Sequence, residues 1–119
     1  MSELKHKLLA TPDIKTASVT EWGCTFWVRC MSGQLRSDWG TAWEKYKKDL
    51  GLGDDCDVVH YYAVMIAHTA CEENGTLLFS MDDVAGLLKK TPQSLKAVFD
   101  AARAINGMKP DAVEDAAKN

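Results

Sequence analysis

The sequence predicts an α+β fold that is mainly α-helical, with an N-terminal β-hairpin packed on a bundle of about four to five helices. Residues 14–31 alternate between apolar and polar side chains around a compact turn, as paired strands do. Residues 32–107 carry apolar side chains at intervals of three and four, which indicates a helical core. The length of 119 residues predicts a single domain, in which residues 108–119 form a short C-terminal helix or tail.

A short helix is predicted for residues 2–10. Ser2 is placed to cap its first turn, and the Thr-Pro-Asp sequence at 11–13 ends or turns it. The apolar residues on one side of this helix are Leu4, Leu8 and Leu9.

The β-hairpin that follows has its turn at residues 21–23 and its second strand at 24–31. The more apolar face of that strand is expected to pack on the helices. It consists of Cys24, Phe26, Val28 and Cys30. Trp27 belongs to the other face, where an isolated hairpin would leave it exposed.

Ser32 predicts the start of a helix that runs to about Lys48. Its apolar side chains form an aromatic ridge at intervals of four, four and three, made of Leu35, Trp39, Trp43 and Tyr46. Such a ridge is more often part of a core than a binding surface.

Asp57 is a plausible cap for the next helix, from Val58 to about Cys71, which is apolar almost all round. A helix without a polar face is usually central in the fold or lies in a subunit interface, and the sequence leaves both options open.

Residues 71–106 predict a helical hairpin, with helices at 81–89 and 92–106. Ser80 and Asp83 have the spacing of a capping box at the start of the first helix.

Thr91-Pro92 begins the second helix, and Gly107 ends it. The same pair of helices could instead form a helix-turn-helix that binds nucleic acid, with Gln93, Ser94 and Lys96 as the plausible base-reading residues. Nearby acidic residues offset the basic ones, so this interpretation is kept as the alternative.

Composition and motifs favour a binding or assembly protein over an enzyme. The net charge of −3 gives no general attraction to nucleic acid or anionic membranes, and no apolar run is long enough to span a bilayer. The absence of a secretory signal predicts a reducing, cytoplasmic location, with four free and mostly buried cysteines. His60 and His68 lack partners at metal-site spacing, so we expect no metal, no cofactor and no catalytic residues. A small enzyme with an unfamiliar site is the remaining alternative.

Two blocks of sequence carry a resemblance to a known family. The first block contains Val19-Thr20-Glu21-Trp22-Gly23, Val28-Arg29 and Ser32-Gly33. The second contains Cys71-Glu72-Glu73-Asn74-Gly75, Leu78-Phe79-Ser80, Asp83-Val84 and Ala104-Ile105-Asn106-Gly107. In this order the blocks resemble the tail assembly chaperones of long-tailed bacteriophages, over about residues 14–119.

The resemblance implies a non-enzymatic function. Members of this family bind the tape-measure protein and keep it soluble until the tail tube polymerises around it. They assemble as homo-oligomeric rings or spirals, often beside a longer frameshifted form, in the host cytoplasm, and they are absent from the mature virion. The resemblance implies no nucleic-acid or membrane partner.

Aromatic side chains are the candidate contact surface for the client and for other copies. Residues 22–46 hold more large aromatics than one helix–hairpin contact readily buries. We therefore expect the surface to contain Trp22 and Trp27 of the hairpin, together with part of the Trp39 and Trp43 ridge.

Overall fold

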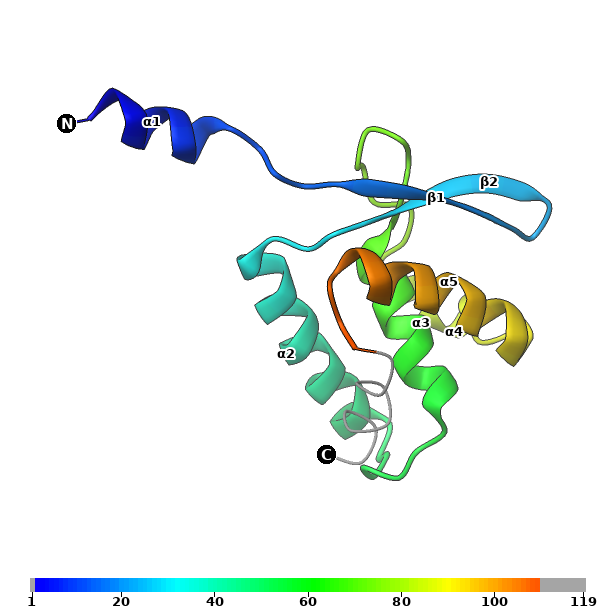
Figure 1. Ribbon diagram of the computed structural model, residues 1–119. Helices are drawn as coiled ribbons and strands as arrows, with labels where there is room; N and C mark the ends of the chain where they lie inside the picture. Colours follow the sequence, from blue (N-terminus) through cyan, green and yellow to red (C-terminus); the bar gives the residue numbers. More distant parts are fainter. Residues whose placement is uncertain (1, 110–119) are drawn as a thin grey trace.

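Helices and a small antiparallel sheet make up residues 2–109, the part of the chain that the computed structural model describes (Figure 1). In chain order the elements are α1 (Glu3–Ala10), β1 (Thr16–Glu21), β2 (Cys24–Arg29), α2 (Gly33–Asp49), α3 (Val58–Thr69), β3 (Ala70–Cys71), the 3-10 turn η1 (Met81–Asp83), α4 (Val84–Leu87) and α5 (Pro92–Ile105). The predicted fold class is confirmed: the protein is mainly helical, and the hairpin packs on the helices. The tail predicted for 108–119 lies outside the described residues from 110 onward.

The hairpin gains a third strand that the sequence did not predict. β1 pairs antiparallel with β2, with Thr16 opposite Arg29 and Glu21 opposite Cys24. β3 pairs with β2 on its other side, so the strand order is β1-β2-β3.

β3 corrects the predicted end of the long apolar helix. That helix, α3, stops at Thr69 instead of continuing to about Cys71. Ala70 already has extended backbone, with ψ of 130°, and lies opposite Val28 in the sheet. Since Ala and Cys fit a helix or a strand, their conformation follows the neighbouring strand and not their own propensity.

α3 is the centre of the fold. Its apolar composition allowed either a central helix or one in a subunit interface, and the structure places it in the core. Most of its side chains are buried, and it packs against α2, α4, α5 and β2. Asp57 caps it as predicted, because the Asp57 carboxylate accepts a hydrogen bond from the Val59 amide at 3.1 Å. Tyr61 of α3 contacts Phe99 of α5, with their ring centres 5.6 Å apart.

The aromatic ridge of α2 belongs to this core. Trp39 and Trp43 are buried, and the Trp43 and Tyr61 rings pack edge to face with their centres 5.3 Å apart. The helix begins where predicted, since the Ser32 hydroxyl accepts a hydrogen bond from the Leu35 amide at 3.1 Å.

The predicted helix at 81–89 is shorter than expected. Its capping box is present, with the Ser80 amide donating to Asp83 Oδ2 at 2.9 Å. However, the first residues form the 3-10 turn η1, and α4 has only four residues. The α-helix ends early because the chain changes to the tighter 3-10 pattern. The backbone amides of Lys89 and Lys90 donate to the carbonyls of Gly86 and Leu87, three residues back.

α5 agrees closely with the prediction for 92–106. Thr91 caps it, and its hydroxyl accepts a hydrogen bond from the Ser94 amide at 3.2 Å. Both α4 and α5 pack on α3, and α5 also covers the hairpin. Gly107 ends the helix with a positive φ of 69°, as its position predicted.

α1 stands apart from the rest of the described structure (Figure 1). The Ser2 hydroxyl caps it by accepting a hydrogen bond from the Leu4 amide at 3.1 Å. No residue of α1 is buried, so the core is built from α2 to α5 and the sheet.

Within residues 2–109, no helix has the length and apolar character needed to cross a membrane. The four cysteines are free, as expected, but only Cys71 is buried, and Cys24 is exposed. The expectation of mostly buried thiols was therefore wrong.

Candidate binding surface

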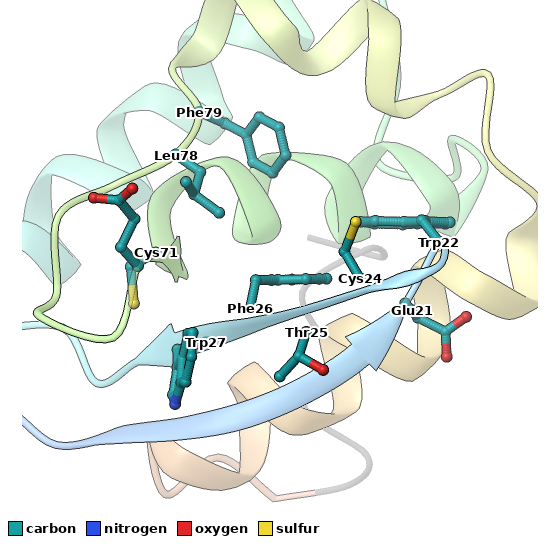
Figure 2. A pocket seen from close by; sticks show the side chains of 10 residues that line it. Glu21, Trp22, Cys24, Thr25, Phe26, Trp27, Cys71, Leu78 and Phe79 are labelled. Carbon is teal, nitrogen blue, oxygen red and sulfur yellow. The ribbon is translucent and has the colours of Figure 1, made fainter.

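An open apolar groove of about 460 Å³ lies between the hairpin and the loop that leads to η1. Its larger apolar side chains are Trp22, Phe26, Trp27, Leu78 and Phe79. Figure 2 shows Phe26 pointing toward Leu78 and Phe79, while Trp27 points to the other side of β2. The groove therefore wraps around the edge of β2 instead of lying on one face of the sheet.

The edge of β2 is open at the groove because β3 is short. β3 pairs only with Trp27 and Val28, so among the described residues no strand covers 24–26 on that side. An open edge presents backbone donors and acceptors beside the apolar side chains. This part of the surface combines a hydrophobic floor with hydrogen-bonding groups.

Trp22 sits at the turn end of the groove in a backbone conformation that disfavours it. Its φ is 53° and that of Gly23 is 74°, as in a two-residue type I′ turn, where Asn and Gly are the preferred residues. The left-handed region costs roughly 1–2 kcal/mol for an ordinary L-residue. Strain of this kind is found at functional positions when surrounding contacts maintain it.

Packing holds the Trp22 ring in place over the groove. It stacks on Phe26 with ring centres 5.6 Å apart and planes 4° from parallel. The Lys90 ammonium lies 5.4 Å from the centre of the Trp22 ring, a cation–π distance. The Trp22 indole N–H is buried and has no hydrogen-bond partner within residues 2–109.

Trp27 is half-buried, which modifies the expectation that its face of the hairpin would leave it exposed. It lies opposite Cys71 in the β2–β3 ladder. β3, the strand that the sequence did not reveal, therefore supplies part of its cover.

The four tryptophans predicted as a contact surface fall into two places. Trp22 and Trp27 both line the groove. Trp39 and Trp43 are buried against α3, with exposed fractions of 9% and 5%. The structure does not bring the two pairs together in one surface.

Three groove residues were missed by the sequence reasoning as contact residues: Phe26, Leu78 and Phe79. Phe26 was assigned to the core face of the hairpin, and it is both buried and at the groove floor. Leu78 is exposed and follows a tight turn, where a large apolar residue is unusual. This position in the sequence could have identified Leu78 as a contact residue.

Carboxylates flank the apolar floor. Glu21 and Glu72 line the groove from the hairpin and from the loop after β3. Burial raises the pKa of the nearby Cys71 thiol, partly offset by the positive charge of Arg29. Cys71 is therefore a neutral, packed side chain and not an activated nucleophile.

His60 and His68 have intrachain partners. The Tyr46 hydroxyl and His60 Nδ1 are 2.7 Å apart, and His68 Nδ1 lies 2.9 Å from the Val64 carbonyl oxygen. In the described part of the chain, no three His, Cys, Asp or Glu side chains are grouped so that they could hold a metal ion.

Two of the three residues proposed to read bases also bond within the chain. Lys96 pairs with Asp100 at 2.8 Å, and the Ser94 hydroxyl donates to the Thr91 carbonyl at 2.9 Å. These bonds do not favour the helix-turn-helix alternative.

Comparison with solved structures finds one fold that matches along nearly the whole chain. The structure of the bacteriophage HK97 tail assembly chaperone aligns with 88% of this chain and 100% of its own, with a TM-score of 0.51 and 19% sequence identity. At this identity the likeness concerns the fold. No protein-family model matches the sequence, and no curated protein matches it.

Proposed function

We propose that this chain is a single-domain tail assembly chaperone of a long-tailed bacteriophage. It binds the tape-measure protein and keeps it soluble until the tail tube polymerises and displaces it. In this proposal the protein acts in the host cytoplasm without enzymatic activity, and it is not retained in the virion. It also self-associates as a ring or spiral, together with a longer frameshifted form of itself.

The observation that carries the proposal is the fold shared with the HK97 tail assembly chaperone over 88% of this chain. The order of sequence motifs supports the same family independently of the structure. Neither observation depends on the groove, so the function and the location of its binding surface can be tested separately.

The groove has the properties that the proposed client requires. A long helical protein that is not yet assembled exposes apolar side chains, and an amphipathic helix binds in a hydrophobic groove through residues spaced three and four apart. Trp22 and Trp27 supply large and rigid contact area, the kind of side chain that dominates interface energies. Because the groove is open, a bound helix would keep one face in solvent and could be displaced.

The strained turn supports a binding role for Trp22. Asn or Gly would suit its backbone better, and the Trp22 ring lines the groove as well as packing against Phe26 and the core. The apolar contact area at the groove is what Asn or Gly at this position would not supply. We accordingly place the contact surface on Trp22 and Trp27, while Trp39 and Trp43 support the α2–α3 core.

Co-expression with the client tests both parts of the proposal. The client for this test is chosen as a long, mainly helical protein encoded beside this chain. Wild-type chain should raise the soluble fraction of the client severalfold, while Trp22→Ala and Trp27→Ala should remove most of that gain. Leu50→Ala is the matched control, since Leu50 is an exposed apolar residue, 56% accessible, that does not line the groove.

Two results would contradict the proposal in different ways. If wild-type protein leaves the client insoluble, the assignment as its chaperone is wrong. If Trp27→Ala changes neither client solubility nor self-association, the function can stand but the placement of its surface is wrong.

A further inference from the structure

α1 combines exposed leucines with a length at which a helix is unstable by itself. Leu4, Leu8 and Leu9 have exposed fractions of 63%, 67% and 76%. The helix has eight residues, whereas isolated helices shorter than about 12–15 residues are marginal in water. An amphipathic helix of this size is stabilised mainly by packing its apolar side on another surface. The core of the same chain does not provide such a surface, because no residue of α1 is buried.

The groove offers a surface of matching character. Its floor is apolar, and Leu78, 43% exposed, lies on it. Its flanking charges are the carboxylates of Glu21 and Glu72 and, at the Trp22 ring, the Lys90 ammonium. α1 carries Lys5 and Lys7 beside its leucines and one acidic residue, Glu3, in its first turn. Opposite charges around an apolar contact favour this pairing and fix its orientation.

The connection between α1 and the hairpin keeps the helix away from the groove of its own chain. The Lys15 amide donates to Cys30 Sγ at 3.1 Å, and the Cys30 amide donates to the Lys15 carbonyl at 2.9 Å. Cys30 Sγ also donates to the Asp13 carbonyl at 3.9 Å. The segment is thus attached to the hairpin from Asp13 onward, and Thr11-Pro12 is the remaining hinge. Proline restricts its own φ and the residue before it.

Reach from this hinge is too short for the leucines of the same chain to contact the turn end of the groove. Three extended steps and the helical rise place Leu8 within about 14 Å of Asp13 and Leu4 within about 20 Å. Trp22, which follows β1 at the turn, lies about 30 Å along the hairpin from Asp13 at the rise of a strand. A second copy has no such limit.

We propose that α1 of one copy docks in the groove of a second copy, with Leu4, Leu8 and Leu9 against Trp22, Phe26 and Leu78. Lys5 and Lys7 then lie near Glu21 and Glu72. Each copy has one α1, the arm of this contact, and one groove. The contact is therefore heterologous and can continue from copy to copy. This inference rests on the proposed self-association and names the surfaces that join the copies, and it needs no client.

Disulfide trapping tests the contact directly, since the exposed Cys24 lines the groove. A chain carrying Leu8→Cys and Cys24→Ser is mixed with wild-type chain and treated with a mild thiol oxidant. A covalent dimer on a non-reducing gel is expected, and it should disappear when the second chain also carries Cys24→Ser. His6→Cys, which is two residues from Leu8 and therefore nearly opposite it on the helix, is the matched control and should give at least fivefold less dimer.

A second measurement uses light scattering across a concentration series. The variant Leu4→Glu/Leu8→Glu/Leu9→Glu should raise the dissociation constant for self-association at least tenfold. Its thermal midpoint should match the wild type, because α1 has no buried residue.

Failure of this inference is distinguishable from failure of the proposed function. If wild-type protein self-associates and the triple variant does so equally, the arm is not the contact, although the chaperone proposal stands. An internal disulfide within single chains that carry Leu8→Cys and retain Cys24 would show docking in the same chain and would overturn the inference. Client solubility is measured separately by co-expression.

Discussion

Asn106, at the end of α5, holds the exit of the hairpin through the backbone of Met31. Its Oδ1 accepts a hydrogen bond from the Met31 amide at 2.7 Å. Its Nδ2 donates to the Arg29 carbonyl at 3.2 Å and to the Ala102 carbonyl at 2.8 Å. One side chain therefore satisfies three backbone groups and joins α5 to β2 near the start of α2.

Replacing this residue should destabilise the fold more than its partial exposure indicates. Asn106→Ala leaves one amide and two carbonyls without their partner, and we expect the free energy of unfolding to fall by about 1–3 kcal/mol. Urea denaturation measures the change. Asn74→Ala is the matched control, because Asn74 is exposed and its side chain accepts only a local bond from the Thr76 amide, at 3.0 Å. Equal losses for the two variants would contradict the bridging role.

The two pairs of tryptophans should differ in what they stabilise. Trp43→Ala removes a buried ring that contacts Tyr61 and should cost about 3–5 kcal/mol of unfolding free energy. Trp27→Ala removes a half-buried ring at the groove, so its cost should be smaller by at least about 1 kcal/mol. Thermal and urea denaturation of both variants provides the comparison. A larger loss for Trp27→Ala would place that side chain in the core.

Trp22→Asn should separate stability from binding. Asn accepts the positive φ of the turn more readily, and this relief offsets part of the stacking on Phe26 that the substitution removes. We expect the unfolding free energy to change by less than about 1.5 kcal/mol, from the balance of these two effects. Client solubilisation should nevertheless be abolished in co-expression. Retained solubilisation would mean that the indole ring is dispensable for binding.

Alkaline pH should destabilise the protein through Tyr61. Burial raises the pKa of its hydroxyl from 10.0 to about 12, despite the opposing effect of the positive charge of Arg36. Between these pH values the unfolded chain loses this proton and the folded chain keeps it, so stability falls as pH rises. The contribution lost over this window is up to roughly 2–3 kcal/mol.

Comparing wild type with Tyr61→Phe isolates this effect from other groups that titrate at high pH. Unfolding free energies are measured by urea denaturation at several pH values from about 9 to about 12. The wild type should lose stability more steeply than the variant above about pH 10. Parallel curves would show that Tyr61 does not contribute.

Local signals in the sequence predicted the helix starts well. Ser32, Asp57 and Thr91 each accept a hydrogen bond from a backbone amide two or three residues ahead, within the same turn. Such a cap depends on a few neighbouring residues, so a short sequence pattern is enough to identify it. The turn at Trp22-Gly23 was found for the same reason.

β3 and the groove could not be predicted in this way. Ala70 and Cys71 become a strand because they meet Val28 and Trp27, which are more than forty positions earlier in the chain. The same pairing brings Leu78 to the hairpin, since the Leu78 amide donates to the Ala70 carbonyl at 3.0 Å. Contacts over such separations leave no periodic pattern in the sequence. The sequence also could not show that Trp39 and Trp43 are buried while Trp22 and Trp27 line the groove. That distinction depends on which face of α2 packs against α3.

The bond between Asn106 and Met31 also has a consequence for the order of folding during translation. The hairpin emerges from the ribosome well before α5, which packs on both β1 and β2. A two-stranded hairpin without a packed face is marginal in water. We therefore expect the nascent hairpin to become stable only after α5 has emerged, so its aromatic side chains stay accessible to ribosome-associated chaperones until then.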